Sequence, residues 1–172
     1  MYKRQALTDA FGRIDVVVTA VLEGLDLDKV NWRPGGAGNS IAWLIWHLAR
    51  IQDEQIAAVA GTGSVWQAGS YAERFAFPLD AGDTGYGHSA RQVDAVQVTE
   101  LGLLGEYHHA VLQQSLRYLR DLDNAQLNQV IDEQGEPPVT LGVRLISIVD
   151  DCLQHGGQAA YVKGLAVELW PH

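Results

Sequence analysis

The sequence predicts an all-α protein folded as an up-down four-helix bundle, with a long connection between the second and third helices. Four stretches place large apolar residues at the i, i+3, i+4, i+7 spacing of a helix with one buried face. A mixed α+β fold would need strands within residues 61–87 or 127–139, and neither segment alternates cleanly between apolar and polar residues. The 172 residues suit a single domain, residues 1–172.

The first two helices are separated by a segment that is rich in glycine and proline. Residues 7–25 carry the first apolar stripe, which comprises Leu7, Phe11, Ile14, Val18, Val21, Leu22 and Leu25. Residues 31–39 (NWRPGGAGN) contain one proline and three glycines, which interrupt a helix. Asn39 or Ser40 is suited to cap the second helix, which is predicted from Ile41 to about Ala60.

The long connection is predicted as loop over residues 61–87, because this segment has six glycines, Pro78 and no helical period. A loop of this length in a compact domain often shapes or covers a site. Ser89 and Gln92 have the spacing of a capping box, so a short helix is expected from Ala90. The third long helix follows, with its stripe at Leu101, Leu104, His108, Val111, Leu112, Leu119 and Leu122.

The fourth long helix is predicted from a cap at Thr140 to about Val167. The segment before it, residues 123–132 (DNAQLNQVID), is expected to form turns, and Pro137 and Pro138 separate it from the helix. The chain is thereby divided into four long helices and their connections, with no sign of a domain boundary.

Composition excludes several classes of function. The formal net charge is -9, from 12 Lys and Arg against 21 Asp and Glu, so the chain lacks the basic surface that binding to nucleic acid requires. No apolar run reaches the roughly 18 to 20 residues of a membrane span, and the start MYKRQALTDA lacks a signal-peptide core. We therefore expect a cytoplasmic protein with no nucleic-acid or membrane partner. The single Cys152 excludes an internal disulfide.

A candidate metal site is indicated on the fourth helix. Asp151 and His155 are four residues apart, so their side chains leave the same face and suit one ion. In a bundle, His47 of the second helix can lie opposite this pair. Two imidazoles and one carboxylate are a known ligand set for catalytic zinc and for non-haem iron or nickel. The spacing alone is also compatible with a solvated aspartate beside an ordinary histidine.

The residues around this pair are unusual for a helix. Gly156 and Gly157 follow His155 directly, and each glycine in a helix interior costs about 1 kcal/mol relative to alanine. Close approach of another backbone or of a ligand would explain them. Gln158 is predicted either to hydrogen-bond a metal-bound water or a group that supports the metal ligands, or to be an ordinary residue on the helix surface.

Three further side chains are candidates for binding a cofactor or substrate. Trp43 is predicted to wall the pocket, with Trp46 and Tyr161, or to belong to the core. Arg50 and Arg144 are predicted to hold an anionic group, the alternative being ion pairs with Glu54 and with a nearby acid.

The other titratable residues are assigned to structure. His108 lies on the core stripe of the third helix, where a buried histidine is expected. His109 and Glu106 form a single Glu-x-x-His unit, whereas di-iron bundles use two. Cys152 is predicted to pack inside as a small apolar residue, the alternative being a reactive thiol near the metal.

Three segments of the chain resemble the DinB/YfiT-like superfamily, especially its actinobacterial branch related to mycothiol-dependent maleylpyruvate isomerase. They are NWRPGGAGNSIAWLIWHLARIQDEQ (31–55), TGYGH (84–88) and PPVTLGVRLISIVDDCLQHGGQAAYVKG (137–164). The family motif is a histidine in the second helix, then far downstream a carboxylate or histidine and a histidine four residues later. These positions are His47, Asp151 and His155. In the isomerase branch the middle ligand is usually Glu, whereas this chain has Asp151, whose side chain is shorter.

The resemblance implies a DinB-like four-helix bundle with a divalent metal, commonly zinc or nickel, near one end. It also implies transferase or isomerase activity that uses a low-molecular-weight thiol such as mycothiol or bacillithiol, and a homodimer. Three functions follow as hypotheses. The first is a metal-dependent thiol S-transferase or isomerase acting on a small electrophile. The second is a metal-dependent hydrolase of a small substrate, and the third is a bundle that binds a metal or ligand without catalysis.

Overall fold

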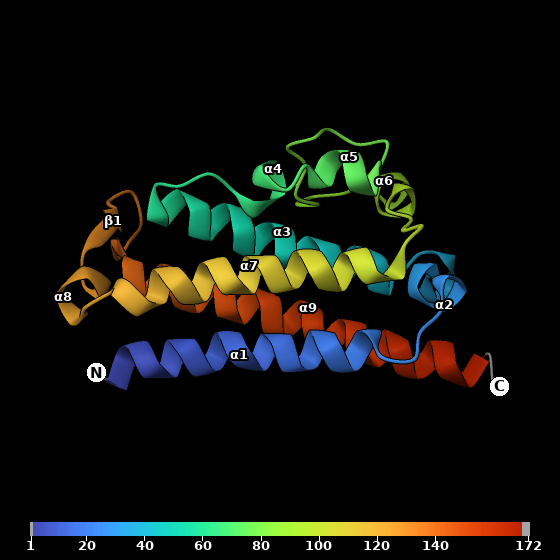
Figure 1. Ribbon diagram of the computed structural model, residues 1–172, viewed down its shortest axis with the longest axis horizontal. Coiled ribbons are helices and arrows are strands. Elements are labelled where there is room, and N and C mark those ends of the chain that lie inside the picture. The colour runs from blue at the N-terminus through green and yellow to red at the C-terminus, as the bar shows by residue number, and fades with distance from the viewer. Residues whose placement is uncertain (1, 170–172) are drawn as a thin grey trace.

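The computed structural model describes residues 2–169 and confirms the four-helix bundle (Figure 1). The long helices are α1 (Tyr2–Leu22), α3 (Ile41–Ala60), α7 (Leu101–Asp121) and α9 (Leu141–Leu169). Both α1 and α3 pack against α7 and α9, so the four helices surround one core. Its fully buried side chains include Phe11, Ile14, Ile45, Leu48, Leu104, Leu119, Leu145 and Ile148. All of them lie on the apolar side that their helix presents to the bundle.

The directions of the helices differ from the predicted up-down order. Figure 1 shows α1 and α9 running one way and α3 and α7 running the other way, so α3 and α7 are parallel. Residues 61–100 carry the chain back along the bundle before α7 begins. Because short turns make successive helices antiparallel, only a connection of this length permits a parallel pair.

The long connection is not the pure loop that its sequence predicts. It contains α4 (Val65–Ala68) and α5 (Tyr71–Phe75), followed by an extended stretch that leads to α6 (Ala90–Ala95). Helices of four and five residues are too short to show a helical period. Aromatic side chains of these two helices and of the stretch just after α5 pack on Trp46 of α3 and Tyr107 of α7; they are Trp66, Tyr71, Phe75 and Phe77. This layer covers one face of α3.

The predicted helix caps are present. Ser40 caps α3 by accepting a hydrogen bond from the Trp43 N–H at 3.1 Å, and Gly61 ends α3 in the left-handed conformation. Ser89 starts α6 through the expected capping box. The Thr140 hydroxyl accepts from the Val143 N–H at 3.3 Å at the start of α9. Local sequence therefore sets where three helices begin.

The expectation of no strands is wrong at one end of the bundle. After α8 (Asn124–Leu127), β1 (Val130–Asp132) pairs antiparallel with β2 (Val139–Thr140). Strands of three and two residues cannot display an alternating pattern, so the sequence carried no signal for them. At the other end, α2 (Leu27–Asn31) and a 3-10 turn (Pro34–Gly36) link α1 to α3.

The longest helix, α9, passes very close to α1. A Cβ atom added at Gly156 would lie 3.1 Å from Cγ1 of Val17, so this glycine makes room for a side chain of α1 rather than for the backbone or ligand that was expected. Nothing lies within 4 Å of the corresponding position at Gly157, which stays unexplained by contacts within one chain. Within residues 2–169, no helix combines the length and the hydropathy that crossing a membrane requires.

Candidate metal centre

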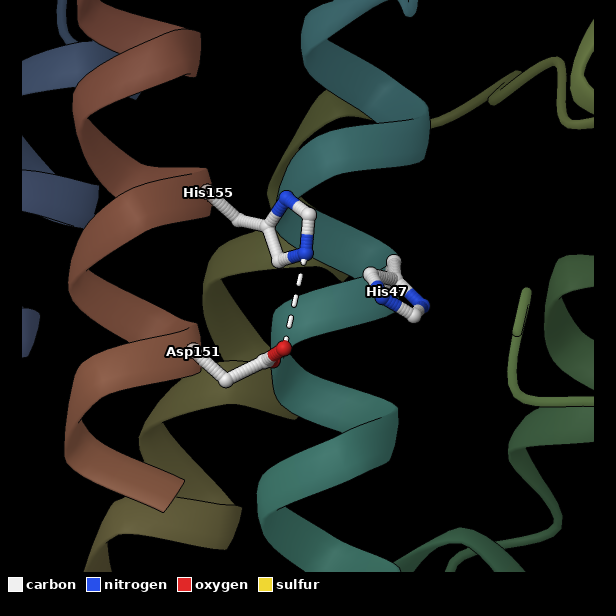
Figure 2. Close-up of side chains that lie close together, drawn as sticks. All are labelled: His47, Asp151 and His155. Carbon is white, nitrogen blue, oxygen red and sulfur yellow. Dashed lines mark ion pairs between the residues drawn. The ribbon is translucent and has the colours of Figure 1, made fainter. Parts of the chain in front are cut away.

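Three predicted ligands meet between α3 and α9. Figure 2 shows His47 projecting from α3 toward Asp151 and His155 of α9. One ligand atom from each residue lies within 4.8 Å of the other two. Nε2 of His155 is 3.7 Å from Oδ1 of Asp151, and the two imidazole rings are 4.7 Å apart. His47, Asp151 and His155 are therefore the residues that would hold a divalent ion, with two imidazole nitrogens and one carboxylate oxygen as donors.

Burial favours the metal-binding form of His47. The side chain is buried, and this burial, assisted by the nearby His155, lowers the pKa of His47 below 6.5, against the opposing hydrogen bond to Thr84. A lowered pKa keeps the imidazole neutral at neutral pH, with a lone pair available to a metal.

Hydrogen bonds fix which nitrogen of each histidine faces the site. Nδ1 of His47 donates to the carbonyl oxygen of Thr84 at 2.5 Å, which leaves the lone pair on Nε2. Nδ1 of His155 donates to Oε1 of Gln158 at 3.2 Å, again leaving Nε2 as the acceptor. Such partners orient metal-binding histidines in known sites. Gln158 thus contacts a candidate ligand directly, whereas the sequence predicted a contact with a metal-bound water or with a supporting group.

Asp151 carries an oxygen that the protein leaves unsatisfied. Its Oδ2 atom is buried and has no hydrogen-bond partner among residues 2–169. Burial of such an atom is costly unless something compensates for it, and a cation is a suitable compensation for a carboxylate oxygen. The donor set and this unsatisfied oxygen therefore fit a divalent metal ion.

The segment TGYGH, quoted above for its resemblance, forms the outer wall of the site. Trp43 stacks on His47, with ring centroids 4.6 Å apart and planes 16° apart. The Trp43 indole N–H donates to Nδ1 of His88 at 3.0 Å, and Nε2 of His88 donates to Asp83 at 2.9 Å. Burial would raise the pKa of Asp83, but hydrogen bonds from Gly85 and His88 outweigh it and lower this pKa. Asp83, Thr84 and His88 were not predicted as site residues.

Arg50 holds the same segment in place rather than facing the three ligands. Its side chain is fully buried, donates from Nε to the carbonyl oxygen of Asp83 at 3.0 Å and pairs with Glu54 at 2.9 Å. The guanidinium also lies 4.5 Å from the centre of the Trp66 ring. With its donors directed to protein groups, Arg50 contributes by positioning Asp83 and the neighbouring Thr84. The ion pair with Glu54, which was the predicted alternative to binding an anionic group, is therefore present.

Several other sequence candidates lie elsewhere. Arg144 is paired with Asp132 of β1 at 3.8 Å, near the strand end of the bundle. Tyr161 is exposed on α9, so it does not wall a pocket. Cys152 is fully buried and burial raises the pKa of its thiol, so it packs as a small apolar residue and is not a reactive thiolate. His108 is a buried core histidine 3.5 Å from Asp15.

Gly85 is the position at which the segment TGYGH (84–88) comes closest to the candidate ligand His47. Its φ is +88°, and a Cβ atom there would lie 2.8 Å from Nδ1 of His47. Gly85→Ala is expected to push the segment away, break the Thr84 bond to His47 and weaken Zn²⁺ binding by about 10- to 100-fold. Isothermal titration of metal-free protein measures this change.

Gly87→Ala is the matched control, because Gly87 also has a positive φ of +71° but nothing lies within 4 Å of its added Cβ. Both variants carry the same kind of backbone strain, so both lose some stability. Only Gly85→Ala should lose metal affinity. Equal affinities in the two variants would show that contact with His47 is unimportant.

Comparison with known proteins places the chain in a family. The family model described as the DinB superfamily matches residues 13–159. The chain belongs to the DinB superfamily. DinB-like proteins often bind divalent metals, in agreement with the candidate site. No curated protein matches the chain.

A solved structure supports the same assignment for this DinB-like chain. The crystal structure described as the conserved protein of locus from Enterococcus faecalis is 32% identical in sequence, with a TM-score of 0.89. The match covers 95% of this chain and 96% of that chain. The DinB-like fold is thus confirmed over nearly the whole chain. The narrower resemblance to the maleylpyruvate isomerase branch is not confirmed.

Proposed function

We propose that this DinB-like protein is a divalent-metal-dependent enzyme that uses a low-molecular-weight thiol. It either transfers the thiol sulfur to a small electrophilic substrate or isomerises that substrate. The observation that carries the proposal is the buried, unsatisfied Oδ2 of Asp151 beside two histidines whose Nε2 atoms are both left as acceptors. Zinc and nickel suit two imidazoles and one carboxylate. Three protein ligands leave room for a further ligand, as in catalytic sites.

The thiol has to come from outside the chain. Cys152 is the only cysteine, and it is fully buried with a raised pKa. A bound divalent ion lowers the pKa of a coordinating thiol and would therefore supply a thiolate nucleophile at neutral pH. A diffusible thiol of the mycothiol type meets this need, since its sulfur is free to reach the ion.

The chain's own residues hold and shield the site. Thr84 and Gln158 keep the protons of His47 and His155 on Nδ1, so that both Nε2 atoms stay available. Trp43 covers one face of the His47 ring and excludes water from it. Two hydrogen bonds, from Trp43 to His88 and from His88 to Asp83, hold this indole in place.

The first test is the metal content of protein purified without an affinity tag and analysed by mass spectrometry of the elements. Wild type is expected to hold about one zinc or nickel ion per chain, and His155→Ala to hold almost none. His109→Ala is the matched control, because His109 is an exposed histidine of α7 outside the site. Equal metal content in wild type and His155→Ala would end the proposal.

The second test separates thiol transfer from hydrolysis. Two histidines and one carboxylate also occur in zinc enzymes that activate water, which favours a hydrolase as the second candidate. Monochlorobimane with mycothiol or cysteine is the probe for S-transfer. The sulfur bonds to the bimane methylene carbon, chloride leaves and the thiol proton passes to solvent. Metal-dependent conjugation above the uncatalysed rate supports the transferase. Metal-dependent ester hydrolysis at a rate that added thiol does not change supports the hydrolase.

A further inference from the structure

A hollow of about 390 Å³ lies at the end of the bundle where α1 and α9 begin (Figure 1). Its volume falls within the roughly 300 to 1,000 Å³ of sites that bind small molecules. Ile146, which lines the hollow, precedes His155 by nine positions of α9, or about 14 Å along the helix. The hollow is therefore separate from the candidate metal centre.

Three parts of the chain enclose the hollow: the first two turns of α1, the end of α8, and the start of α9 with the residue before it. Gly142 lets α8 and α9 meet closely, because a Cβ atom there would lie 3.0 Å from the carbonyl oxygen of Leu127. Side chains of α1 and α9 form the two walls. The hollow thus exists only because the fold joins segments that are distant in the sequence.

The position of each side chain along the hollow follows from the contact between α1 and α9. These two helices run parallel (Figure 1), and Gly156 of α9 packs on Val17 of α1. Because both helices rise by about 1.5 Å per residue, equal steps back from this contact place Lys3 level with Gly142. Lys3 therefore lies at the end of the bundle, and the residues after it line the part nearer the middle.

The part of the hollow nearer the middle of the bundle is apolar. It is lined by Ala6 and Leu7 of α1 and by Val143 and Ile146 of α9. Val143 and Ile146 are more than half exposed, although both are large apolar side chains. An aliphatic chain that covered them would remove apolar surface from water, which favours binding.

The outer end of the hollow is polar and carries one positive charge. Nζ of Lys3 donates to Oδ1 of Asn128 at 3.2 Å, which uses one of its three N–H groups. Within residues 2–169 Lys3 has no acidic partner, and the NH2 group of Asn128 has no acceptor. Lys3 is the only charged residue among those that line the hollow. The first turn of α9 adds the partial positive charge of a helix N-terminus.

We infer that this hollow binds a small aliphatic carboxylate. Its two oxygens accept hydrogen bonds from Lys3 and Asn128, and its chain lies over Val143 and Ile146, between α1 and α9. One carboxylate charge balances one ammonium charge, in a chain whose net charge of -9 otherwise disfavours anions. A phosphate monoester, with close to two negative charges, would leave about one charge without a partner. The site does not depend on the proposed enzymatic function.

The first experiment is a titration of isotope-labelled protein with octanoate, followed by nuclear magnetic resonance. The amide signals of Gly142, Val143 and Ile146 are expected to shift and to reach saturation. The affinity should rise by up to about four-fold for each methylene from butanoate to hexanoate to octanoate, because each one adds buried apolar surface. Unchanged signals in the hollow, or shifts only around His47 and Asp151, would overturn the site.

Ile146→Glu tests the apolar wall, since it places a negative charge where the aliphatic chain is expected to lie. It should lower the affinity for octanoate by about 10-fold or more. Val16→Glu is the matched control, because Val16 is 68% exposed on α1, does not line the hollow, and gives the same change in net charge. Its affinity should equal that of wild type. Equal losses in the two variants would show that net charge, rather than the hollow, governs binding, and would overturn the inference.

Lys3→Gln tests the charged end of the hollow, and it is expected to fold because Lys3 is exposed. It should lower the affinity for octanoate by about three- to five-fold, as for an exposed ion pair, and leave the affinity for octanol nearly unchanged. Arg91→Gln is the control, because Arg91 is exposed on α6 at the other end of the molecule (Figure 1). Wild type that binds octanol or octylamine as tightly as octanoate would overturn the assignment of a carboxylate.

Discussion

Replacing Asp151 by Asn is expected to lower the affinity for Zn²⁺ by at least about 100-fold, while the metal-free protein stays folded. Loss of a residue that merely orients a ligand costs about 10- to 100-fold, and this substitution also removes the only negative charge of the donor set. The buried Oδ2 accepts no hydrogen bond, and the partly exposed pair with His155 contributes at most about 1 kcal/mol. Competition with a chelating dye measures the affinity.

Asp150→Asn is the control for this experiment. Asp150 precedes Asp151 in the chain, but it is exposed and its carboxylate accepts from Gln154 at 2.8 Å, outside the metal site. Its neutralisation changes the net charge equally and should leave Zn²⁺ affinity nearly unchanged. A similar loss in both variants would mean that overall charge, rather than coordination by Asp151, governs binding. Thermal melts in the presence of a chelator check the metal-free fold.

The long helices could be predicted because their information is local. The apolar spacing gave α3 as Ile41 to Ala60, as observed, and Thr140 marked the start of α9. Helix direction depends instead on where a long connection, residues 61–100, places the next helix. Sequence spacing does not contain this information, and the up-down order was therefore wrong.

The three candidate ligands could be predicted for a related reason. Asp151 and His155 share a helix face by geometry alone, and bundle packing together with the family motif supplied His47. The orienting groups could not be found in this way. Thr84 accepts the hydrogen bond from His47 through its main-chain carbonyl, 37 positions away in the chain. Because every residue type has this carbonyl, the sequence gives no signal for the contact.

The segment TGYGH did carry one usable signal. Two glycines beside a histidine, in a loop long enough to cover a site, indicate a backbone that approaches something closely. The close contact of Gly85 with His47 is that approach. The contacted residue could be identified only from the fold, because the contact depends on Arg50 of α3, which holds the carbonyl group of Asp83 in place across 33 positions of the chain.

A buried carboxylate fastens that layer to the bundle. Asp53 of α3 is fully buried and accepts three hydrogen bonds of 2.8 Å, from the N–H groups of Val65 and Trp66 and from the hydroxyl of Tyr107. Arg50 lies 4.0 Å away. One side chain thus joins α3, the start of α4 and α7. Sequence inspection gave no reason to single it out, because an aspartate within a helix is usually solvated.

Asp53→Ala is expected to lower the free energy of unfolding by about 3 to 5 kcal/mol. The substitution leaves the buried donors of Val65, Trp66 and Tyr107 without an acceptor and removes a negative charge near the buried Arg50. The control is Asp9→Ala, since Asp9 pairs with Arg13 on the surface at 2.6 Å, where solvent screens the charges and loss of the pair should change stability little. Urea unfolding followed by tryptophan fluorescence measures both. Comparable losses in the two variants would contradict a fastening role for Asp53.

The pH dependence of this loss has a defined sign. Burial raises the pKa of Asp53 above 3.8, and the hydrogen bonds from Val65, Trp66 and Tyr107 offset only part of the rise. In the window above pH 3.8 the folded state therefore holds the proton more tightly than the unfolded state, so the contribution of Asp53 falls as pH rises through its folded pKa. The difference in unfolding free energy between wild type and Asp53→Ala should accordingly be larger at about pH 4 than at about pH 7. The opposite trend would mean that ionised Asp53 is favoured by its three donors more than burial disfavours it.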